Sequence, residues 1–345
     1  MNSGNTLASR HTVSNYFARE HLANAVALGG NERDIMAIAG LTHEQLKQPK
    51  ARVLAPQLAS IVVSCWKLSG DELFGFTKQK IKLGMFSLLS ERLINCKNLE
   101  GVLMYIKSFY TLTGDQLLID INQKASQVHL TVNANFKSRG SISSPNSLLI
   151  ELLLLICHRF SSWLLGQVVP LNRVFMRHSS PSHHEEYRLM FSCPYTFECE
   201  YNALVFDAKY LSSPVVRNQQ DLKKYLNDIP LQWFKKQSYY DTCSSQVIRI
   251  LEESDFGKEC NIDSISATLG ITSRTLRRRL TAEGCMFQNL KDNARRDHAI
   301  NLFERSELTI SDIGIKVGFT EAATFTRAFK HWTGVSPSTY RKYSS

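Results

Sequence analysis

The feature of this 345-residue sequence that most restricts its fold is a pattern that occurs twice near the C-terminus. Each copy has a short segment with apolar residues at helical spacing, then a glycine, then a second segment with its own apolar stripe. Gly270 and Gly318 are the two glycines. Each copy therefore predicts a helix-turn-helix unit, whose second helix is free to enter a major groove of DNA.

The two units are predicted over residues 262–283 and 310–333, with a linking helix between them over residues 287–303. Asp263 is placed to cap the first helix of the first unit, and Thr320 is placed to cap the second helix of the second unit. The sequence thus predicts an all-α C-terminal domain with two helix-turn-helix units joined by a linking helix.

Positive charge is concentrated in the same part of the chain. The whole sequence has 41 Lys and Arg against 31 Asp and Glu, a net charge of +10. Residues 271–345 hold 13 Lys or Arg and 7 Asp or Glu, so this fifth of the chain carries +6 of that charge. A basic segment alone is usually a solvated helix face, but two ordered helix-turn-helix patterns favour neutralisation of DNA phosphates.

Arginines of the first unit are candidate base readers. Leu276 and Leu280 lie four positions apart on one face of the predicted helix, and Arg274 and Arg278 fall on the opposite face. The planar guanidinium can donate two hydrogen bonds to O6 and N7 of guanine. We expect these two arginines to contact bases, whereas Arg277 beside them could reach either a base or a phosphate.

The last part of the chain contains four stretches with a distinctive order of residues. They are 310–314, 317–320, 325–330 and 334–341, which read ISDIG, VGFT, FTRAFK and GVSPSTYR. Through them, the chain resembles the AraC/XylS family of bacterial transcription regulators over about residues 245–343. Upstream, the preceding domain resembles the arabinose-binding-like effector and dimerisation domain of one AraC subgroup. The residues that carry this second resemblance are Pro170, Val174-Phe175, His178, Pro181, Tyr187, Phe191, Cys193-Pro194, Phe197, Asn202-Ala203-Leu204-Val205-Phe206 and Leu211 to Pro214.

The resemblance implies base-contact positions in the second unit at Ala322, Ala323, Thr324 and Arg327. This sequence departs from the polar residues often found there, because an alanine can touch a thymine methyl group but cannot donate a hydrogen bond. Arg327 could equally bind a phosphate. Arg279 lies beside the stripe of Leu276 and Leu280, so it is expected to be structural or to face a phosphate. Lys330 and Arg341 are expected to contact phosphates or to be solvated, and Thr281 is expected to contact a phosphate.

The residues before position 213 predict an α+β domain. Apolar spacing up to about residue 110 is mostly helical, residues 116–136 alternate as a strand pair, and residues 145–165 predict a long helix. Further strands are expected at the following positions: 173–176, 187–191 and 203–207. We therefore predict an effector-binding and dimerisation domain over residues 1–212, a linker region over 213–244 and the DNA-binding domain over 245–345.

Metal and enzyme chemistry find little support in the sequence. The eight cysteines form no CxxC pair, which argues against a zinc ribbon or disulfide scaffold and favours a reducing compartment. His178, His183 and His184 lie near Cys193 and Cys199, but their spacing fits no zinc site, and a surface loop with satisfied histidines is favoured. Because there is no nucleophile elbow, Walker sequence or GxGxxG, we expect no enzyme activity and no metal or cofactor.

No membrane segment is expected, and a cytoplasmic location is predicted. The first thirty residues lack a secretory signal, and the longest apolar run, 148–157, is interrupted by Glu151 and is shorter than the roughly 20 residues that span a bilayer.

Together these observations predict a sequence-specific regulator of double-stranded promoter DNA. The resemblance implies a homodimer, activation rather than repression, contact with RNA polymerase and a small-molecule effector. The alternative is control by a protein partner or by dimerisation alone, since a pocket containing His178, Tyr187 and Phe191 could equally be core.

Overall fold

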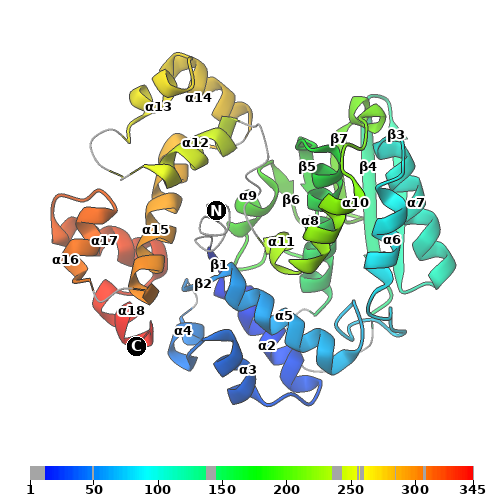
Figure 1. Cartoon of the computed structure of the whole chain (residues 1–345), viewed down its shortest axis with the longest axis horizontal. Coiled ribbons are helices and arrows are strands. Elements are labelled where there is room, and N and C mark those ends of the chain that lie inside the picture. Colours follow the sequence, from blue (N-terminus) through cyan, green and yellow to red (C-terminus); the bar gives the residue numbers. More distant parts are fainter. Residues whose placement is uncertain are drawn as a thin grey trace. The chain divides into compact units, whose positions relative to one another are not determined.

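The computed structural model describes residues 12–48, 50–136, 145–234, 243–254, 256, 260–283, 285–305 and 308–344 (Figure 1). The chain forms two compact units. The first unit comprises Met1–Arg19, Met36–Ser60 and Lys235–Ser345, and the second comprises Glu20–Ile35 and Ile61–Phe234. The boundaries predicted at residues 212 and 245 stay a prediction, and the structure adds that residues near the N-terminus are grouped with the C-terminal part.

The second compact unit contains a five-stranded sheet of order β3-β4-β7-β5-β6, in which only the β5 and β6 pair is parallel. Its strands are β3 (Leu117–Lys124), β4 (Gln127–Ala134), β5 (Leu171–Phe175), β6 (Tyr195–Thr196) and β7 (Ala203–Asp207). Alternate residues of β4 are buried, with Val128, Leu130 and Val132 facing the core. The strand pair expected from the alternating pattern at residues 116–136 is therefore confirmed.

Helices cover this sheet (Figure 1). Helix α7 (Leu99–Thr113) packs against β3, and α8 (Pro145–Leu165) packs against β4 and β7. Helix α6 (Met85–Leu93) packs against α7, α10 (Gln219–Asn227) against α6, and α11 (Leu231–Phe234) against α8. The other helices of this compact unit include α9 (Glu186–Phe191) and the 3-10 helix η1 (Ala208–Ser212), which follows β7. Helix α8 has the bounds that the sequence predicts, and its span Ser147–Leu165 is apolar and long enough to cross a membrane. Most of that span is buried inside the protein, as expected of a core helix.

The strand predicted at residues 187–191 is wrong, because this segment is helix α9. Its aromatic residues favoured a strand, but Tyr187 and Phe191 lie four positions apart and both are buried. This spacing suits one face of a helix, so packing against the core decides the local structure.

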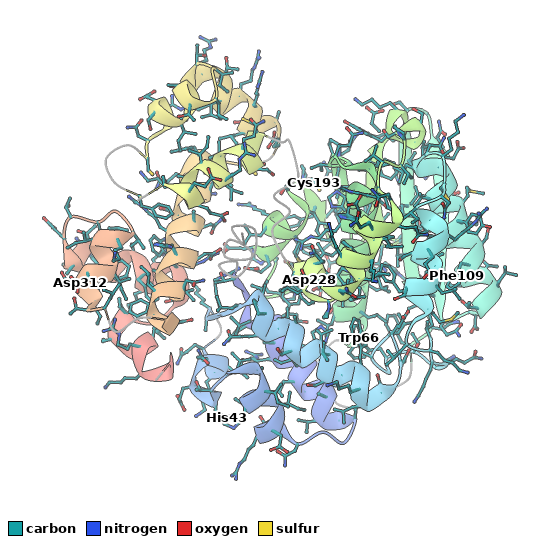
Figure 2. All side chains as sticks on the ribbon, in the orientation of Figure 1. His43, Trp66, Phe109, Cys193, Asp228 and Asp312 are labelled. Carbon is teal, nitrogen blue, oxygen red and sulfur yellow. The ribbon has the colours of Figure 1, made fainter. Side chains whose placement is uncertain are left out.

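The first compact unit contains the C-terminal helices, whose side chains are drawn in Figure 2. They are α12 (Cys243–Glu253), α13 (Ile262–Thr268), α14 (Ser273–Ala282), α15 (Phe287–Arg305), α16 (Ile310–Lys316), α17 (Ala322–Thr333) and α18 (Pro337–Ser344). Helix α15 supplies Leu290 and Ala294 to one hydrophobic core and Ala299, Ile300 and Phe303 to another. The all-α domain with a linking helix is thereby confirmed.

Residues near the N-terminus complete the second of these cores. Strands β1 (Thr12–Ser14) and β2 (Arg52–Leu54) form an antiparallel ribbon, and Leu54 is part of the core that contains Phe325, Phe329 and Tyr340. We call this pair of strands the N-terminal ribbon. The helices that accompany it in sequence are α2 (Asn15–Ala27), α3 (Glu32–Ala39), α4 (His43–Lys47) and α5 (Ala55–Ser69). The sequence pattern did not reveal the ribbon, because its partners lie far away along the chain.

Polar groups tie the N-terminal ribbon to α15 and α18. The hydroxyl of Thr12 donates to Oδ1 of Asp297, and Nε of Arg52 donates to the Thr12 hydroxyl oxygen at 2.8 Å. The Tyr340 hydroxyl donates to the carbonyl oxygen of Arg52 at 3.3 Å, and Arg296 pairs with Asp297 at 2.9 Å. All five residues are buried, so these hydrogen bonds are made away from water and hold the ribbon in place.

Candidate nucleic-acid interface

The first helix-turn-helix unit begins at a capped helix. Asn261 is the N-cap of α13 and forms a capping box with Ser264. The expectation that Asp263 caps this helix is wrong. Its carboxylate instead accepts a hydrogen bond from the hydroxyl of Ser273, so it joins α13 to the first turn of α14. Gly270 occupies the turn between them with a φ of +67°, a conformation that glycine adopts without strain.

Helix α14 presents its arginines away from the core. Leu276 and Leu280 are buried, whereas Arg274 and Arg278 are exposed on the opposite side of the helix and Arg277 is exposed beside them. Within the described residues, none of these three arginines forms an ion pair. Three guanidinium groups are therefore free to bind an anion or a base edge.

The remaining first-unit candidates, Arg279 and Thr281, are exposed as well. Thr272 caps the helix by accepting a hydrogen bond from the backbone N–H of Thr275. Because the cap fixes where α14 begins, it also fixes which residues lie at the exposed N-terminal end of the helix.

The second unit has the same plan with a tighter contact between its helices. Thr309 and Asp312 form a capping box at the start of α16, and these hydrogen bonds lower the pKa of the Asp312 carboxyl (labelled in Figure 2). A Cβ at Gly314 would lie 3.2 Å from atoms of Phe325 on α17, so the small residue allows the two helices to approach closely. Gly318 then turns the chain with a φ of +82°.

Helix α17 differs from expectation at its first residue. Glu321, not Thr320, is the N-cap, and no side-chain hydrogen bond caps the helix. The extended backbone of Glu321 places Thr320 outside the capping position. The Glu321 carboxylate instead accepts a hydrogen bond from the hydroxyl of Thr324 at 3.3 Å.

The predicted contact residues of the second unit lie on the exposed face of α17. Phe325 and Phe329 are fully buried, while Ala322, Ala323, Thr324 and Arg327 are exposed, as is Lys330. One Arg327 nitrogen lies 3.4 Å from the Thr324 hydroxyl oxygen, within reach of a hydrogen bond. The structure thus places the second set of candidates together on one surface.

Arg341 is partly engaged with groups of its own domain. Its guanidinium donates to the carbonyl oxygen of Leu308 and lies 5.2 Å from the ring centre of Phe303. The side chain is partly buried, so it holds α18 against the segment that precedes α16. Its assignment to a phosphate stays a prediction.

Sequence reasoning missed Arg295 in the middle of the linking helix. Its guanidinium donates to the carbonyl oxygen of Gly318 at 3.0 Å and lies 4.9 Å from the ring centre of Phe319. The signal available in the sequence was the Gly318-Phe319 pair at a turn, which requires some residue of a neighbouring helix to pack beside it.

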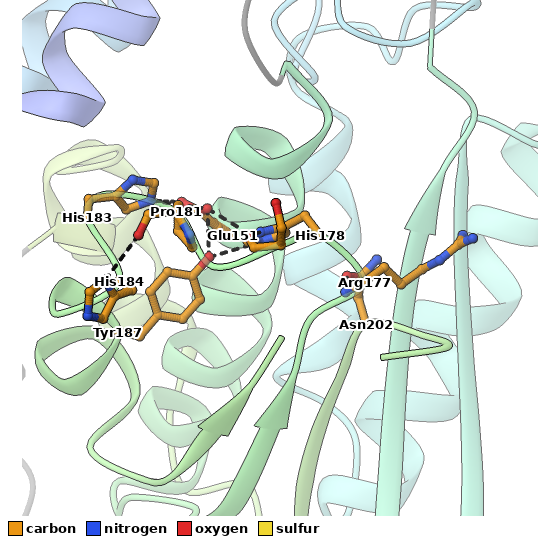
Figure 3. A network of polar contacts seen from close by, with 9 residues as sticks. Glu151, Arg177, His178, Pro181, His183, His184, Tyr187 and Asn202 are labelled. Atoms are coloured by element: carbon orange, nitrogen blue, oxygen red, sulfur yellow. Dashed lines mark hydrogen bonds and ion pairs between the residues drawn. The ribbon is translucent and has the colours of Figure 1, made fainter. Parts of the chain in front are cut away.

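Two histidines of the compact unit that contains the sheet, His178 and His183, take part in a polar cluster around the buried Glu151 (Figure 3). Glu151 of α8 is fully buried and accepts a hydrogen bond from the Tyr187 hydroxyl at 2.7 Å, and Nε2 of His183 lies 3.1 Å from its other oxygen. Nε2 of His178 lies 3.1 Å from the Tyr187 hydroxyl. The expectation of a surface loop is wrong for His183, which is buried, and holds for His184, which is exposed.

Within the described residues, no group of three or more His, Cys, Asp or Glu side chains is arranged to hold a metal ion. The eight cysteines, all of which are described, are free thiols. Burial raises the pKa of the Cys193 thiol to about 12, which keeps this thiol protonated.

Comparisons with known proteins match both parts of the chain. Residues 29–215 match the family model described as the arabinose-binding domain of AraC transcription regulator, N-terminal, and residues 265–343 match a helix-turn-helix domain model. The ornithine utilization regulator of Pseudomonas aeruginosa is 23% identical over 336 residues, 94% of each chain. An uncharacterized HTH-type transcriptional regulator of Mycobacterium bovis is 39% identical over 88 residues, 26% of each chain. Among solved structures, the transcriptional regulator CdpR from Pseudomonas aeruginosa matches with 18% identity and a TM-score of 0.33, covering 94% of this chain and 98% of its own.

Proposed function

Because the chain belongs to the AraC family of transcription regulators, we propose that α14 and α17 bind successive major grooves on one face of double-stranded promoter DNA. The observation that carries this proposal is the exposed face of α14. Arg274 and Arg278 lie there opposite the buried Leu276 and Leu280, with Arg277 beside them, and none of the three has an ion-pair partner among the described residues. Such a surface supplies both charge for phosphates and planar donors for guanine.

The two helices divide the work of recognition in this proposal. Arg274 and Arg278 contact guanine, and Arg277 contacts a base or a neighbouring phosphate. On α17 the methyl groups of Ala322 and Ala323 contact thymine methyls, while Thr324 and Arg327 supply the polar contacts. The second block of DNA is therefore read partly by apolar contact, with fewer hydrogen bonds from arginine than the first.

Phosphate contacts position the protein without selecting a sequence. We assign this role to Arg279, Thr281, Lys330 and Arg341. Arg341 contributes less to phosphate binding than the other three, because its guanidinium already contacts Leu308 and Phe303.

The N-terminal region supplies regulation in this proposal. It binds a small-molecule effector and forms the homodimer, and the bound protein activates transcription through RNA polymerase in the cytoplasm. The match of residues 29–215 to the arabinose-binding domain model supports the effector. An effector changes activity only if it binds one arrangement of the protein more tightly than another.

The DNA-contact assignment is tested with two variants. A duplex is selected from a random library with the wild-type chain, and binding is then measured against single-base variants of that duplex and at several salt concentrations. Arg278→Ala is expected to relax the preference at one base pair and to cost about 1 to 3 kcal/mol. Lys330→Ala is the matched control. It should weaken binding to all sequences alike and reduce the salt slope, which is the slope of log affinity against log salt concentration, by about 1.

An Arg278→Ala protein with unchanged affinity and unchanged preference would show that α14 is not the reading helix.

The effector is tested by melting-temperature shifts across a panel of small metabolites that includes ornithine and sugars. A compound that raises the melting temperature and changes DNA affinity supports the effector. No shift with any compound, together with an intact dimer, favours control by dimerisation or by a protein partner.

A further inference from the structure

The two helix-turn-helix units meet at the turn of the second unit. Gly318 lies in this turn with a φ of +82°, and a Cβ built on it would overlap the carbonyl oxygen of Phe256. Phe256 belongs to the core of the first unit and is buried. The backbone of the second unit therefore approaches the backbone of the first without room for any side chain.

One side chain of the linking helix closes this junction. Arg295 of α15 donates to the carbonyl oxygen of Gly318 at 3.0 Å, and its guanidinium lies 4.9 Å from the ring centre of Phe319. The side chain is partly buried, and this burial lowers the pKa of its guanidinium, although an arginine stays charged. The hydrogen bond fixes the carbonyl and the stacking fixes the ring, so both residues of the turn are held.

The position of Arg295 along α15 explains why it can join the units. Ala294 beside it belongs to the first core, and Ala299 belongs to the second. One turn further along, the ring centre of His298 lies 5.6 Å from that of Phe256. The same stretch of helix thus contacts Phe256, which belongs to the first core, and the turn of the second unit.

We propose that Arg295 is a positioning residue that sets the orientation of α17 relative to α14, and thereby the spacing of the two DNA blocks that the protein accepts. This inference rests on the proposed function, in which both helices enter major grooves. Arg295 itself contacts no base in this account. It acts through the backbone of Gly318 and the ring of Phe319, which precede α17.

Helical geometry makes spacing a sensitive readout. One inserted base pair moves the second block by about 3.4 Å and rotates it by about 34 to 36° around the duplex, since one turn has 10 to 10.5 base pairs. A rigid junction cannot follow this displacement, so one of the two helices loses its groove or the DNA must deform. A loosened junction accommodates part of the displacement.

The experiment uses the full chain and a duplex selected from a random library by the wild-type protein. Footprinting first establishes two protected blocks, and derivatives then carry one base pair more or one fewer between them. We expect the wild type to lose affinity about tenfold or more on either change, the size of one lost recognition contact. Arg295→Met should bind the selected duplex several-fold more weakly, because it lacks the donor and the planar group. We call the loss of affinity on adding or removing one base pair the spacing penalty, and in Arg295→Met this penalty should be below about threefold.

Two further variants separate positioning from charge and from folding. Arg295→Lys keeps a donor for the Gly318 carbonyl and should restore part of the spacing penalty. Arg249→Met removes an exposed arginine of α12, so it loses the same charge and should keep the full penalty. The salt slope of Arg295→Met should equal that of the wild type, since Arg295 neutralises no phosphate.

The outcomes are distinct. If Arg295→Met binds weakly but keeps the full spacing penalty, Arg295 only stabilises the fold and the inference is overturned. Should that variant fail to fold, an unchanged spacing penalty in Arg295→Lys together with wild-type affinity overturns it as well. A wild-type footprint with a single protected block would instead overturn the proposed function, and this inference with it.

Discussion

The two helix-turn-helix units share one plan and differ in what each gives to the molecule. Helix α14 exposes four arginines, Arg274, Arg277, Arg278 and Arg279, and the described residues of its core all come from position 243 onward. Helix α17 exposes two alanines, a threonine and one arginine together with Lys330 and His331, and its core includes Leu54 from the N-terminal ribbon. The first unit is equipped for sequence reading, whereas the second is the one attached to the N-terminal residues of the chain. A repeated motif can therefore separate recognition from attachment.

The largest difference in stability between the two units is expected at their turn glycines. Gly318→Ala should destabilise the protein by about 3 kcal/mol or more, because the new Cβ needs a strained positive φ and overlaps the Phe256 carbonyl. Gly270→Ala is the matched control in the first unit. It has a similar φ but no described atom within 4 Å of the new Cβ, so it should cost about 1 to 2 kcal/mol. Urea unfolding measures both, and equal losses would show that the junction at Gly318 is not tightly packed.

A second prediction concerns the cores of the two units. Leu54→Ala removes a buried leucine from the core of the second helix-turn-helix unit. Leu290→Ala removes one from the core of the first helix-turn-helix unit. Each should cost about 2 to 3 kcal/mol. The cost of Leu54→Ala should appear as faster amide hydrogen exchange in α16 and α17, and that of Leu290→Ala as faster exchange in α12 and α13.

If Leu54→Ala leaves exchange in α16 and α17 unchanged, the N-terminal ribbon is not part of the second core in solution.

The smallest effect is expected for the polar side of the ribbon. Thr12→Val keeps the shape of the side chain but removes the hydroxyl between Arg52 and Asp297. Because those hydrogen bonds involve charged groups, the loss should be about 1.5 kcal/mol. Thr272→Ala removes the cap of α14 and should cost about 1 kcal/mol, but from the first unit. Thermal unfolding measures the loss of stability in both variants, and amide hydrogen exchange then assigns each loss to one helix-turn-helix unit. Faster exchange in α14 after Thr12→Val would contradict the assignment of the ribbon to the second unit.

Local patterns predicted the parts of this molecule that local forces decide. The apolar stripes with Leu276, Leu280, Phe325 and Phe329 gave both helix-turn-helix units because burial at helical spacing depends on neighbours within two turns. The alternation in β4 succeeded for the same reason. The segment from Tyr187 failed because aromatic residues suit a strand or a helix, and only contacts with α8 decide between them.

Long-range contacts were outside the reach of pattern reading. Thr12 and Asp297 are 285 positions apart, and nothing in either segment announces the other. The caps show a milder form of the same difficulty. Asn261 and Asp263 are both good N-cap residues two positions apart, and the first turn of α13 is settled by the capping box with Ser264.

In the proposed complex, exposed arginines of α14 read guanine while α17 occupies the next groove. Dimethyl sulfate protection of guanine N7 on a selected duplex tests it most directly, with the full chain and its Arg278→Ala variant. The account predicts that the wild type protects a guanine in one of two blocks about 10 base pairs apart, and that the variant loses this protection while the other block is still covered. Protection of that guanine by Arg278→Ala to the same extent as by the wild type would contradict it.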